Sequence, residues 1–216
     1  MQSPSSINTY LQCPRKYYFQ YKLKLPTYPS IHLVRGSVAH LALENFYSLV
    51  PEVIGDEYRK HLKTVLVQLL HKYWKEAKPE FDELDMSQQQ IDEYYDQTVM
   101  MMDYHADIII QRLDKLVSQG YSFPEAFRRI TPKVEAEYLS WEHYVKGFID
   151  IVEEVDGKIR LMDYKTSKRN KLNDQYKLQL SIYAFLYKEK HGKLPDEVGI
   201  YFLKFPGAEG ELTLTA

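Results

Sequence analysis

The stretch 147–165 constrains the fold more than any other part of the chain. It contains the apolar run Gly-Phe-Ile-Asp-Ile-Val, the sequence Val-Asp-Gly-Lys and the run Leu-Met-Asp-Tyr-Lys, in that order. Asp-Gly is the preferred centre of a two-residue type I′ turn, so these residues predict a β-hairpin with its turn at 156–157. Val155 then pairs with Lys158, and counting outward along both arms places Asp150 opposite Asp163.

This opposed pair of acids predicts a site that needs a cation. Directly opposed residues point to the same face, with Cβ atoms about 4.5–5.5 Å apart. Two carboxylates repel at that separation, and their apolar neighbours make an uncompensated charge costly. Lys165 is one candidate cation because it follows Asp163 by two residues and therefore shares its strand face; a divalent metal is the other. An Asp pair with an adjacent Lys suits metal-assisted phosphodiester hydrolysis, which favours a nuclease.

Composition limits the class of protein. A chain of 216 residues with 44% hydrophobic content is long enough for one globular domain with a substantial core. The sequence has no apolar run of membrane-spanning length and no signal-peptide core at its start, so we expect no membrane partner and a cytoplasmic location. The single Cys13 excludes an intrachain disulfide framework and a self-contained zinc finger or four-thiolate iron–sulfur cluster.

Charge is unevenly distributed along the chain. The formal net charge is −2, yet residues 1–43 contain no acidic residue and carry +5, while residues 165–177 carry +4. Two basic zones on an otherwise acidic chain are typical of a surface that contacts phosphates. A chance excess of solvated basic side chains is the alternative for either zone alone.

Hydrophobic periodicity predicts a helical N-terminal half followed by strands. We expect helices at 5–21, 37–50, 56–77, 87–118 and 174–191, and a loop at 26–36. We expect strands at 134–139, in both arms of the hairpin, at 198–203 and at 211–214.

Several of these segments together carry a family resemblance. They are Gly36-Ser37-Val38-Ala39-His40, Asp150, Asp163-Tyr164-Lys165, Gln179 with Tyr183, and the opening run from Ser5 to Tyr18. In this order the set resembles the PD-(D/E)XK nuclease superfamily in its RecB-like branch, which includes the CRISPR-associated RecB-like exonucleases. The resemblance implies an α/β fold with a restriction-endonuclease-like core, a mixed central sheet flanked by helices. It also implies that 1–216 form a single nuclease domain with a helical insertion at 51–130.

The resemblance assigns metal ligands. His40, Asp150 and Asp163 would bind Mg²⁺ or Mn²⁺, with the carbonyl of Tyr164 as a possible fourth ligand, and hard oxygen donors favour those ions on chemical grounds as well. Taken alone, a histidine such as His40 is ordinarily a core or surface residue whose hydrogen bonds are made within the fold. Together with the other motifs, the interpretation as a metal ligand is favoured instead. Glu44, one turn later, either holds the imidazole or forms a plain surface pair.

Three further residues receive roles from the same resemblance. Lys165 would orient the attacking water or stabilise charge on the phosphate, and Gln179 and Tyr183, one helical turn apart, would support the lysine or contact substrate. Glu135 and Glu137 share a strand face near the site; we expect a solvated edge there, with an additional ligand as the alternative.

Basic and aromatic residues provide the expected nucleic-acid contacts. They are Arg15, Lys16, Tyr17, Arg35, Lys168 and Arg169, and the N-terminal tyrosines could stack on bases of a single strand. Some members of the branch bind an iron–sulfur cluster through four cysteines. Cys13 stands where the first would be and the other three are missing, so either this member never binds a cluster or the chain lacks its C-terminal tail. We expect no cluster and an ordinary buried thiol.

The sequence therefore predicts a Mg²⁺- or Mn²⁺-dependent DNA nuclease, exonucleolytic on single strands or ends. Recombination, repair or CRISPR adaptation would be its pathway, with a helicase or a CRISPR adaptation protein as a possible partner. The alternative is a non-catalytic member of the fold that binds nucleic acid or a helicase.

Overall fold

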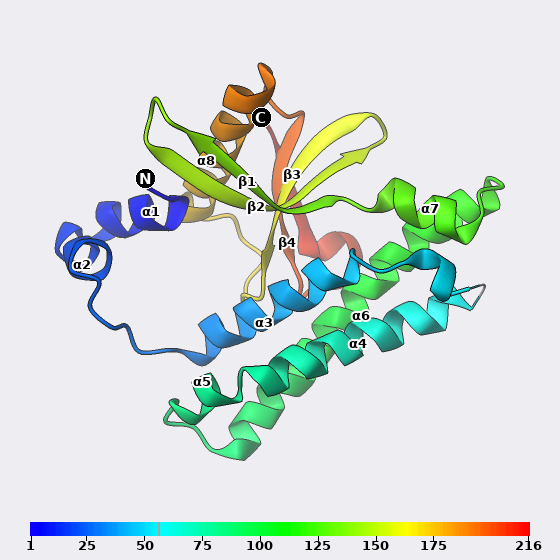
Figure 1. The fold of residues 1–216 in the computed structure, drawn as a ribbon, viewed down its shortest axis with the longest axis horizontal. Helices are drawn as coiled ribbons and strands as arrows, with labels where there is room; N and C mark the ends of the chain where they lie inside the picture. Colours follow the sequence, from blue (N-terminus) through cyan, green and yellow to red (C-terminus); the bar gives the residue numbers. More distant parts are fainter. Residues whose placement is uncertain (56) are drawn as a thin grey trace.

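A five-stranded mixed β-sheet forms the centre of the molecule (Figure 1). The computed structural model describes residues 1–55 and 57–216. The strands lie in the order β1 (Lys133–Ser140), β2 (Val145–Val155), β3 (Lys158–Lys165), β4 (Glu197–Phe202) and β5 (Glu211–Thr215). β3 pairs with β4 in parallel, and each other neighbouring pair in the sheet is antiparallel. The parallel pair needs a crossover, which α8 (Asp174–His191) supplies.

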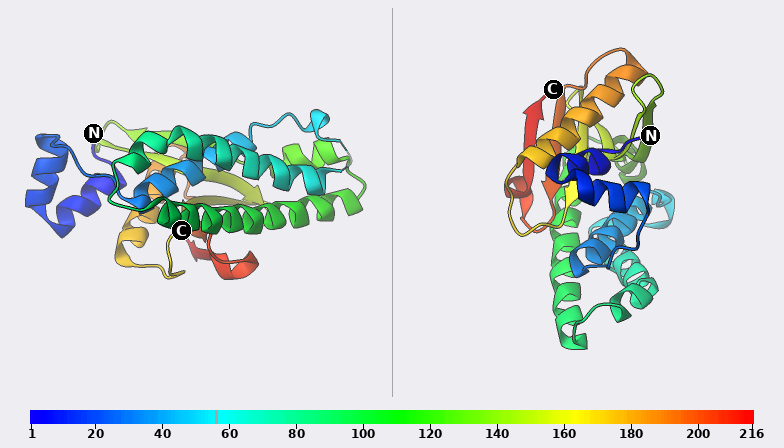
Figure 2. Two further views of the ribbon diagram at one scale, coloured as in Figure 1. Left: turned by 90° about the horizontal axis from the view of Figure 1, so that it is seen from below. Right: turned by 90° about the vertical axis from the view of Figure 1, so that its left-hand side faces the viewer.

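The remaining helices come mainly from the first 130 residues. They are α1 (Pro4–Gln12), α2 (Pro14–Tyr17), a π-helical turn (Tyr18–Lys22), α3 (Ile31–Phe46), a 3₁₀ turn (Pro51–Val53), α4 (Tyr58–Glu76), α5 (Lys78–Asp82), α6 (Gln88–Ser118), α7 (Phe123–Ile130) and a late 3₁₀ turn (Gly207–Gly210). α3, α4 and α6 run side by side below the sheet, and both views of Figure 2 keep them together. Within the part of the chain that the structure describes, no helix combines the length and apolar character needed to cross a bilayer.

The two faces of the sheet belong to two hydrophobic clusters. Met162, Tyr164 and Tyr201 pack with the helical bundle on one face. Leu161 and Ile200 pack with α8 on the other. The expected α/β class, a mixed sheet with helices on its faces, is therefore confirmed. The bundle shares its core with the sheet, so α3 and α6 are held firmly against the strands that carry the acidic residues.

The hairpin forms in the predicted register. Asp156 and Gly157 have φ values of 51° and 78°, the left-handed conformations that a type I′ turn requires at both central positions. Val155 pairs with Lys158, and the ladder continues to Ile151 opposite Met162. The ladder ends at that pair, and Asp150 and Asp163 are the next residues along the two strands.

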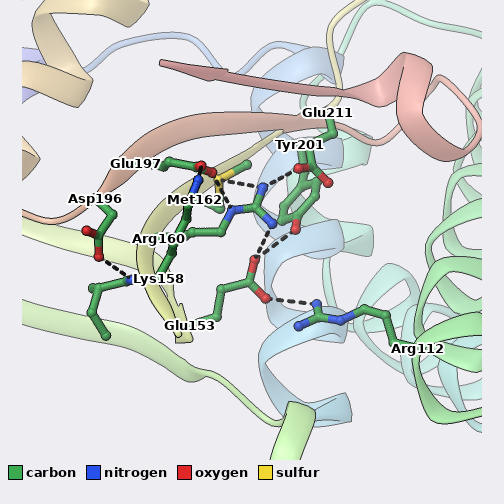
Figure 3. Close-up of polar contacts among 10 residues, drawn as sticks. Arg112, Glu153, Lys158, Arg160, Met162, Asp196, Glu197, Tyr201 and Glu211 are labelled. Carbon is green, nitrogen blue, oxygen red and sulfur yellow. Dashed lines mark hydrogen bonds and ion pairs between the residues drawn. The ribbon is translucent and has the colours of Figure 1, made fainter. Parts of the chain in front are cut away.

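A network of buried charges fixes α6 to the sheet (Figure 3). Glu153 of β2 is 5% exposed; its carboxylate lies 2.8 Å from Arg112 Nη1 of α6 and accepts a 2.9 Å hydrogen bond from the hydroxyl of Tyr201. Arg160 of β3 lies 3.6 Å from the same carboxylate and also pairs with Glu197 and Glu211. Because removing one partner from such a network leaves a buried charge unpaired, it joins α6, β2, β3, β4 and β5 strongly.

The N-terminal helices differ from those expected. The predicted helix at 5–21 is broken at Cys13, whose backbone is extended and whose thiol accepts from the N–H of Lys16 at the start of α2. Pro14 starts that second helix because it has no N–H to leave unsatisfied. Cys13 is exposed, so the expectation of a buried thiol is wrong.

The helix that carries His40 starts earlier than predicted. The predicted start at Ser37 is wrong: α3 begins at Ile31, with Ser30 as its N-cap, and continues through Gly36 and Ser37. Burial of Ile31 and Val34 stabilises this extra turn and a half against the bundle. The helix predicted at 56–77 is observed as α4, and its expected first residue, 56, lies outside the described residues.

Candidate active site

Three acidic side chains meet where β2 and β3 separate. Asp150 of β2 is 8% exposed and Asp163 of β3 is 2% exposed. On the other side of β2, the ladder pairs that flank Glu135 of β1 place it next to Asp150. The hydrogen bond that the ladder would make here is replaced, because the N–H of Tyr164 donates to Asp150 Oδ2 at 2.7 Å. The sheet thus presents a row of carboxylates across three strands.

Glu135 is held in a strained backbone conformation. Its φ of 46° is in the left-handed region, which is uncommon for a residue with a Cβ. The ladder of β1 with β2 skips this residue and resumes at Ala136 opposite Ile149. Such local strain persists where the surrounding structure overdetermines it and is frequent at functional sites.

His40 of α3 faces two of these acids. Its Nδ1 lies 3.4 Å from Asp150 Oδ2 and 4.0 Å from Glu135 Oε1. Its Nε2 lies 3.1 Å from the carbonyl oxygen of Tyr164. A carbonyl can only accept, so Nε2 is assigned the proton and Nδ1 presents its lone pair toward the acids. Burial lowers the pKa of His40, which keeps the imidazole neutral at pH 7, the form that binds metals.

Asp163 has a different set of partners. Its Oδ1 accepts from Gln179 Nε2 at 2.8 Å and from the hydroxyl of Tyr183 at 3.4 Å, both on α8. Gln179 Nε2 also lies 2.8 Å from the Tyr183 hydroxyl, so the two side chains support each other. The ammonium of Lys165 pairs with Asp163 Oδ2. α8 therefore orients Asp163, and Asp163 in turn positions Lys165.

The pKa values of the acidic cluster are shifted by burial and because its carboxylates outnumber its cations. Burial, and then the charge of Asp163, raise the pKa of Asp150 well above its usual value. Burial raises the pKa of Glu135 as well. Burial acts to lower the pKa of Lys165, but its pairing with Asp163 and the nearby Asp150 outweigh that effect and raise it, so the lysine stays charged.

The residues present fit a divalent cation. In residues 1–55 and 57–216, no lysine or arginine forms an ion pair with Asp150 or Glu135. One ligand atom from each of His40, Glu135 and Asp150 lies within 4.8 Å of the others. Two carboxylates with one neutral imidazole are a donor set that Mg²⁺ and Mn²⁺ accept. Lys165 compensates Asp163, and the other two acids are left for a metal.

The structure brings together most of the residues singled out from sequence, with two differences. Asp163, an expected ligand, lies outside the group formed by His40, Glu135 and Asp150, and the carbonyl of Tyr164 is occupied by His40. Glu135, for which a solvated edge was expected, is half-buried and faces His40. Glu135 could be assigned to the site from sequence only through the register of β1 on β2. The sequence of the turn between these two strands does not fix that register.

The expected nucleic-acid contacts divide into exposed and buried residues. Arg15, Lys16, Lys168 and Arg169 are exposed. Tyr17 is partly buried; its hydroxyl donates to Gln2 and its ring stacks on that of Tyr21 at 5.3 Å. Arg35 is 1% exposed and therefore does not lie on the surface as expected.

Comparison with known proteins identifies a family. A family model described as the PD-(D/E)XK nuclease superfamily matches residues 2–215. A search of curated proteins gave no match.

Proposed function

Since the chain belongs to the PD-(D/E)XK nuclease superfamily, whose members are generally metal-dependent nucleases, we propose that it is a Mg²⁺- or Mn²⁺-dependent DNA nuclease. We further propose that it acts as an exonuclease on single strands or duplex ends. The observation that carries the proposal is the partly compensated acidic cluster: Lys165 pairs with Asp163, while Asp150 and Glu135 lie beside the neutral His40 and, among the described residues, form no ion pair with a lysine or arginine.

The metal would be held by His40, Glu135 and Asp150. When bound there, a divalent ion supplies Lewis acidity at the phosphate and lowers the pKa of water. The Tyr164 carbonyl fixes the imidazole by accepting from Nε2, and the Tyr164 N–H fixes the Asp150 carboxylate. Both partners are main-chain atoms of one residue, so the ligands keep their orientation without a further side chain.

Lys165 would act on the phosphate. Its ammonium stays protonated because Asp163 pairs with it, so it can stabilise negative charge that develops in the transition state. Gln179 and Tyr183 hold Asp163 from α8 and act on the lysine through it. They are therefore positioning residues in this mechanism.

The substrate and pathway are inferred from surface charge and from the sequence motifs. Exposed Arg15 and Lys16 on α2 and exposed Lys168 and Arg169 after β3 provide positive charge for the phosphate backbone. The motif resemblance to the RecB-like branch supports a role in recombination, repair or CRISPR adaptation, with a helicase or a CRISPR adaptation protein as partner.

The test is cleavage by the purified chain. We expect degradation of linear single-stranded DNA with Mg²⁺ or Mn²⁺, none in EDTA, and none of circular single strands. Asp150→Ala, Asp163→Ala and Lys165→Ala should each abolish cleavage, while Glu154→Gln, an exposed acid on β2, should not. Cleavage that survives all three alanine changes would refute the site. Cutting of circles would refute the exonuclease, and no cleavage of any DNA or RNA would favour a non-catalytic binding protein.

A further inference from the structure

Arg35 links three elements of the site from a buried position. It lies five positions before His40 on α3, and its side chain is 1% exposed. Its Nη2 donates to the carbonyl oxygen of Thr166 at 2.6 Å, and its guanidinium lies 5.2 Å above the ring centroid of Tyr94 on α6. Thr166 directly follows Lys165, so one side chain connects the histidine helix, the exit of the lysine strand and the bundle.

Burial of this guanidinium with no carboxylate beside it among the described residues lowers the stability of the folded protein. Its Nε and Nη1 are buried and have no hydrogen-bond partner, and across the described parts of the chain no carboxylate pairs with it. Burial lowers the pKa of Arg35, which reflects the same penalty. By contrast, Arg160, which is 8% exposed, pairs with three carboxylates. A buried, unpaired polar group in a native structure needs an explanation outside stability.

The backbone around Lys165 supplies that explanation. β3 ends at Lys165, and residues 166–173 form no helix or strand before α8 begins. Two contacts run from α3 to this strand exit: His40 to the carbonyl of Tyr164, and Arg35 to the carbonyl of Thr166. They bracket Lys165 on both sides. Without the second, the chain after Lys165 would lose its hydrogen bond to α3.

We propose that Arg35 is a positioning residue that sets the place of the Lys165 ammonium through the Thr166 carbonyl, at a cost in folding stability. This inference rests on the proposed nuclease function. It adds to that function a residue that contacts neither metal nor substrate and that the fold retains in spite of its unsatisfied donors.

The test is Arg35→Met, which removes the charge and the donors but keeps an unbranched side chain. We expect kcat for DNA cleavage to fall roughly 10- to 100-fold, because displacements of about 1 Å at reacting groups have effects of that size. KM for DNA should stay within about 2-fold, since no substrate contact is lost. The unfolding midpoint should be unchanged or higher, because replacing an unpaired buried charge by an apolar group removes a penalty.

A second readout does not depend on activity. Amide hydrogen exchange of the metal-free protein at 166–168 should be faster in Arg35→Met than in the parent. Arg160→Met is the matched control: it removes one ion-pair partner from each of three carboxylates, so its midpoint should fall while exchange at 166–168 and kcat of the folded protein stay as in the parent.

These measurements separate the possible outcomes. If Arg35→Met lowers the midpoint and leaves kcat and exchange unchanged, Arg35 is a structural residue and the proposal is overturned. If Arg35→Met does not fold, Arg35→Lys, which keeps the charge but only one donor group, should show a reduced kcat and faster exchange; parental values for both overturn the proposal. A parent that cleaves nothing refutes the nuclease, and exchange at 166–168 still decides the role of Arg35.

Discussion

Asp150→Asn should have opposite effects on the stability of the metal-free and metal-bound protein. Asn keeps the shape of the side chain, and its oxygen can still accept from the N–H of Tyr164, the 2.7 Å bond that orients Asp150. The substitution removes one of two buried carboxylates, and the charge of the other, Asp163, acts on Asp150 enough to raise its pKa. It therefore relieves repulsion without opening a cavity.

The size of the gain follows from the separation of the strands. Opposed side chains lie about 5 Å apart, and at an effective dielectric of about 20 two unit charges at that distance repel by about 3 kcal/mol. The ammonium of Lys165 beside Asp163 offsets part of this, so we expect a net gain of about 1–2 kcal/mol in the metal-free protein. For a chain of this length the unfolding midpoint should rise by about 2–8 °C.

The gain should grow with pH. Burial and the charge of Asp163 raise the pKa of Asp150 in the folded protein, so the folded form holds the proton more tightly than the unfolded form. The metal-free parent therefore loses stability as the pH rises through the folded pKa of Asp150, which lies above the usual 3.8. Asp150→Asn has no such loss, because an amide does not titrate.

With Mn²⁺ bound, the parent should have a higher unfolding midpoint than Asp150→Asn, the reverse of the order without metal. Ion at 100 times its dissociation constant stabilises the parent by about 2.7 kcal/mol, and the variant lacks a ligand and should gain much less. The assay is thermal unfolding of both proteins with EDTA and with Mn²⁺, at pH 6 and pH 8. A variant with a lower metal-free midpoint than the parent, or with the full manganese shift of the parent, would refute the electrostatic reasoning.

Two other predictions concern regions away from the metal. Burial, and then the charge of Arg112, lower the pKa of His105 to about 3, so the unfolded chain gains a proton below pH 6.5 that the folded protein takes up only near pH 3. The stability that His105 contributes is therefore lost as pH falls through this window, by on the order of 4 kcal/mol at pH 3. In His105→Gln the midpoint of denaturant unfolding should change less with pH between pH 6.5 and 3 than it does in the parent. A pH dependence equal to that of the parent would contradict this. Arg15→Glu with Lys16→Glu should weaken DNA binding and lower its salt slope by about 0.7 per lost phosphate contact; the parental slope in a fluorescence titration would remove this surface from the interface.

The hairpin shows what the sequence could predict. Its register follows from two residues, Asp156 and Gly157, because few other residues accept positive φ at both turn positions. The same register predicts Asp150 opposite Asp163, one step beyond the last pair of the observed ladder, Ile151 with Met162. α8 was equally predictable, since Gly192 ends it in the left-handed conformation that favours glycine.

Contacts between distant segments could not be predicted in the same way. Glu135 enters the site through pairing of β1 with β2 and a left-handed backbone that no turn residue announces. Arg35 was expected at the surface because arginine is rarely buried without an acidic partner, and within the described residues the structure buries it with no carboxylate beside it. The start of α3 was misplaced because Gly36 and Ser37 usually mark helix boundaries, and packing of the preceding turn overrides that preference.

The residues of the site come from widely separated parts of the chain, and this has a consequence for biosynthesis. His40 lies on a helix made early, while Gln179 and Tyr183 lie on α8, near the C-terminus. Chains emerge from the ribosome N-terminal end first, so His40 is exposed long before α8 can dock on the sheet. A growing chain therefore has no means to orient Asp163 and Lys165 through α8 until residues 174–191 have been synthesised.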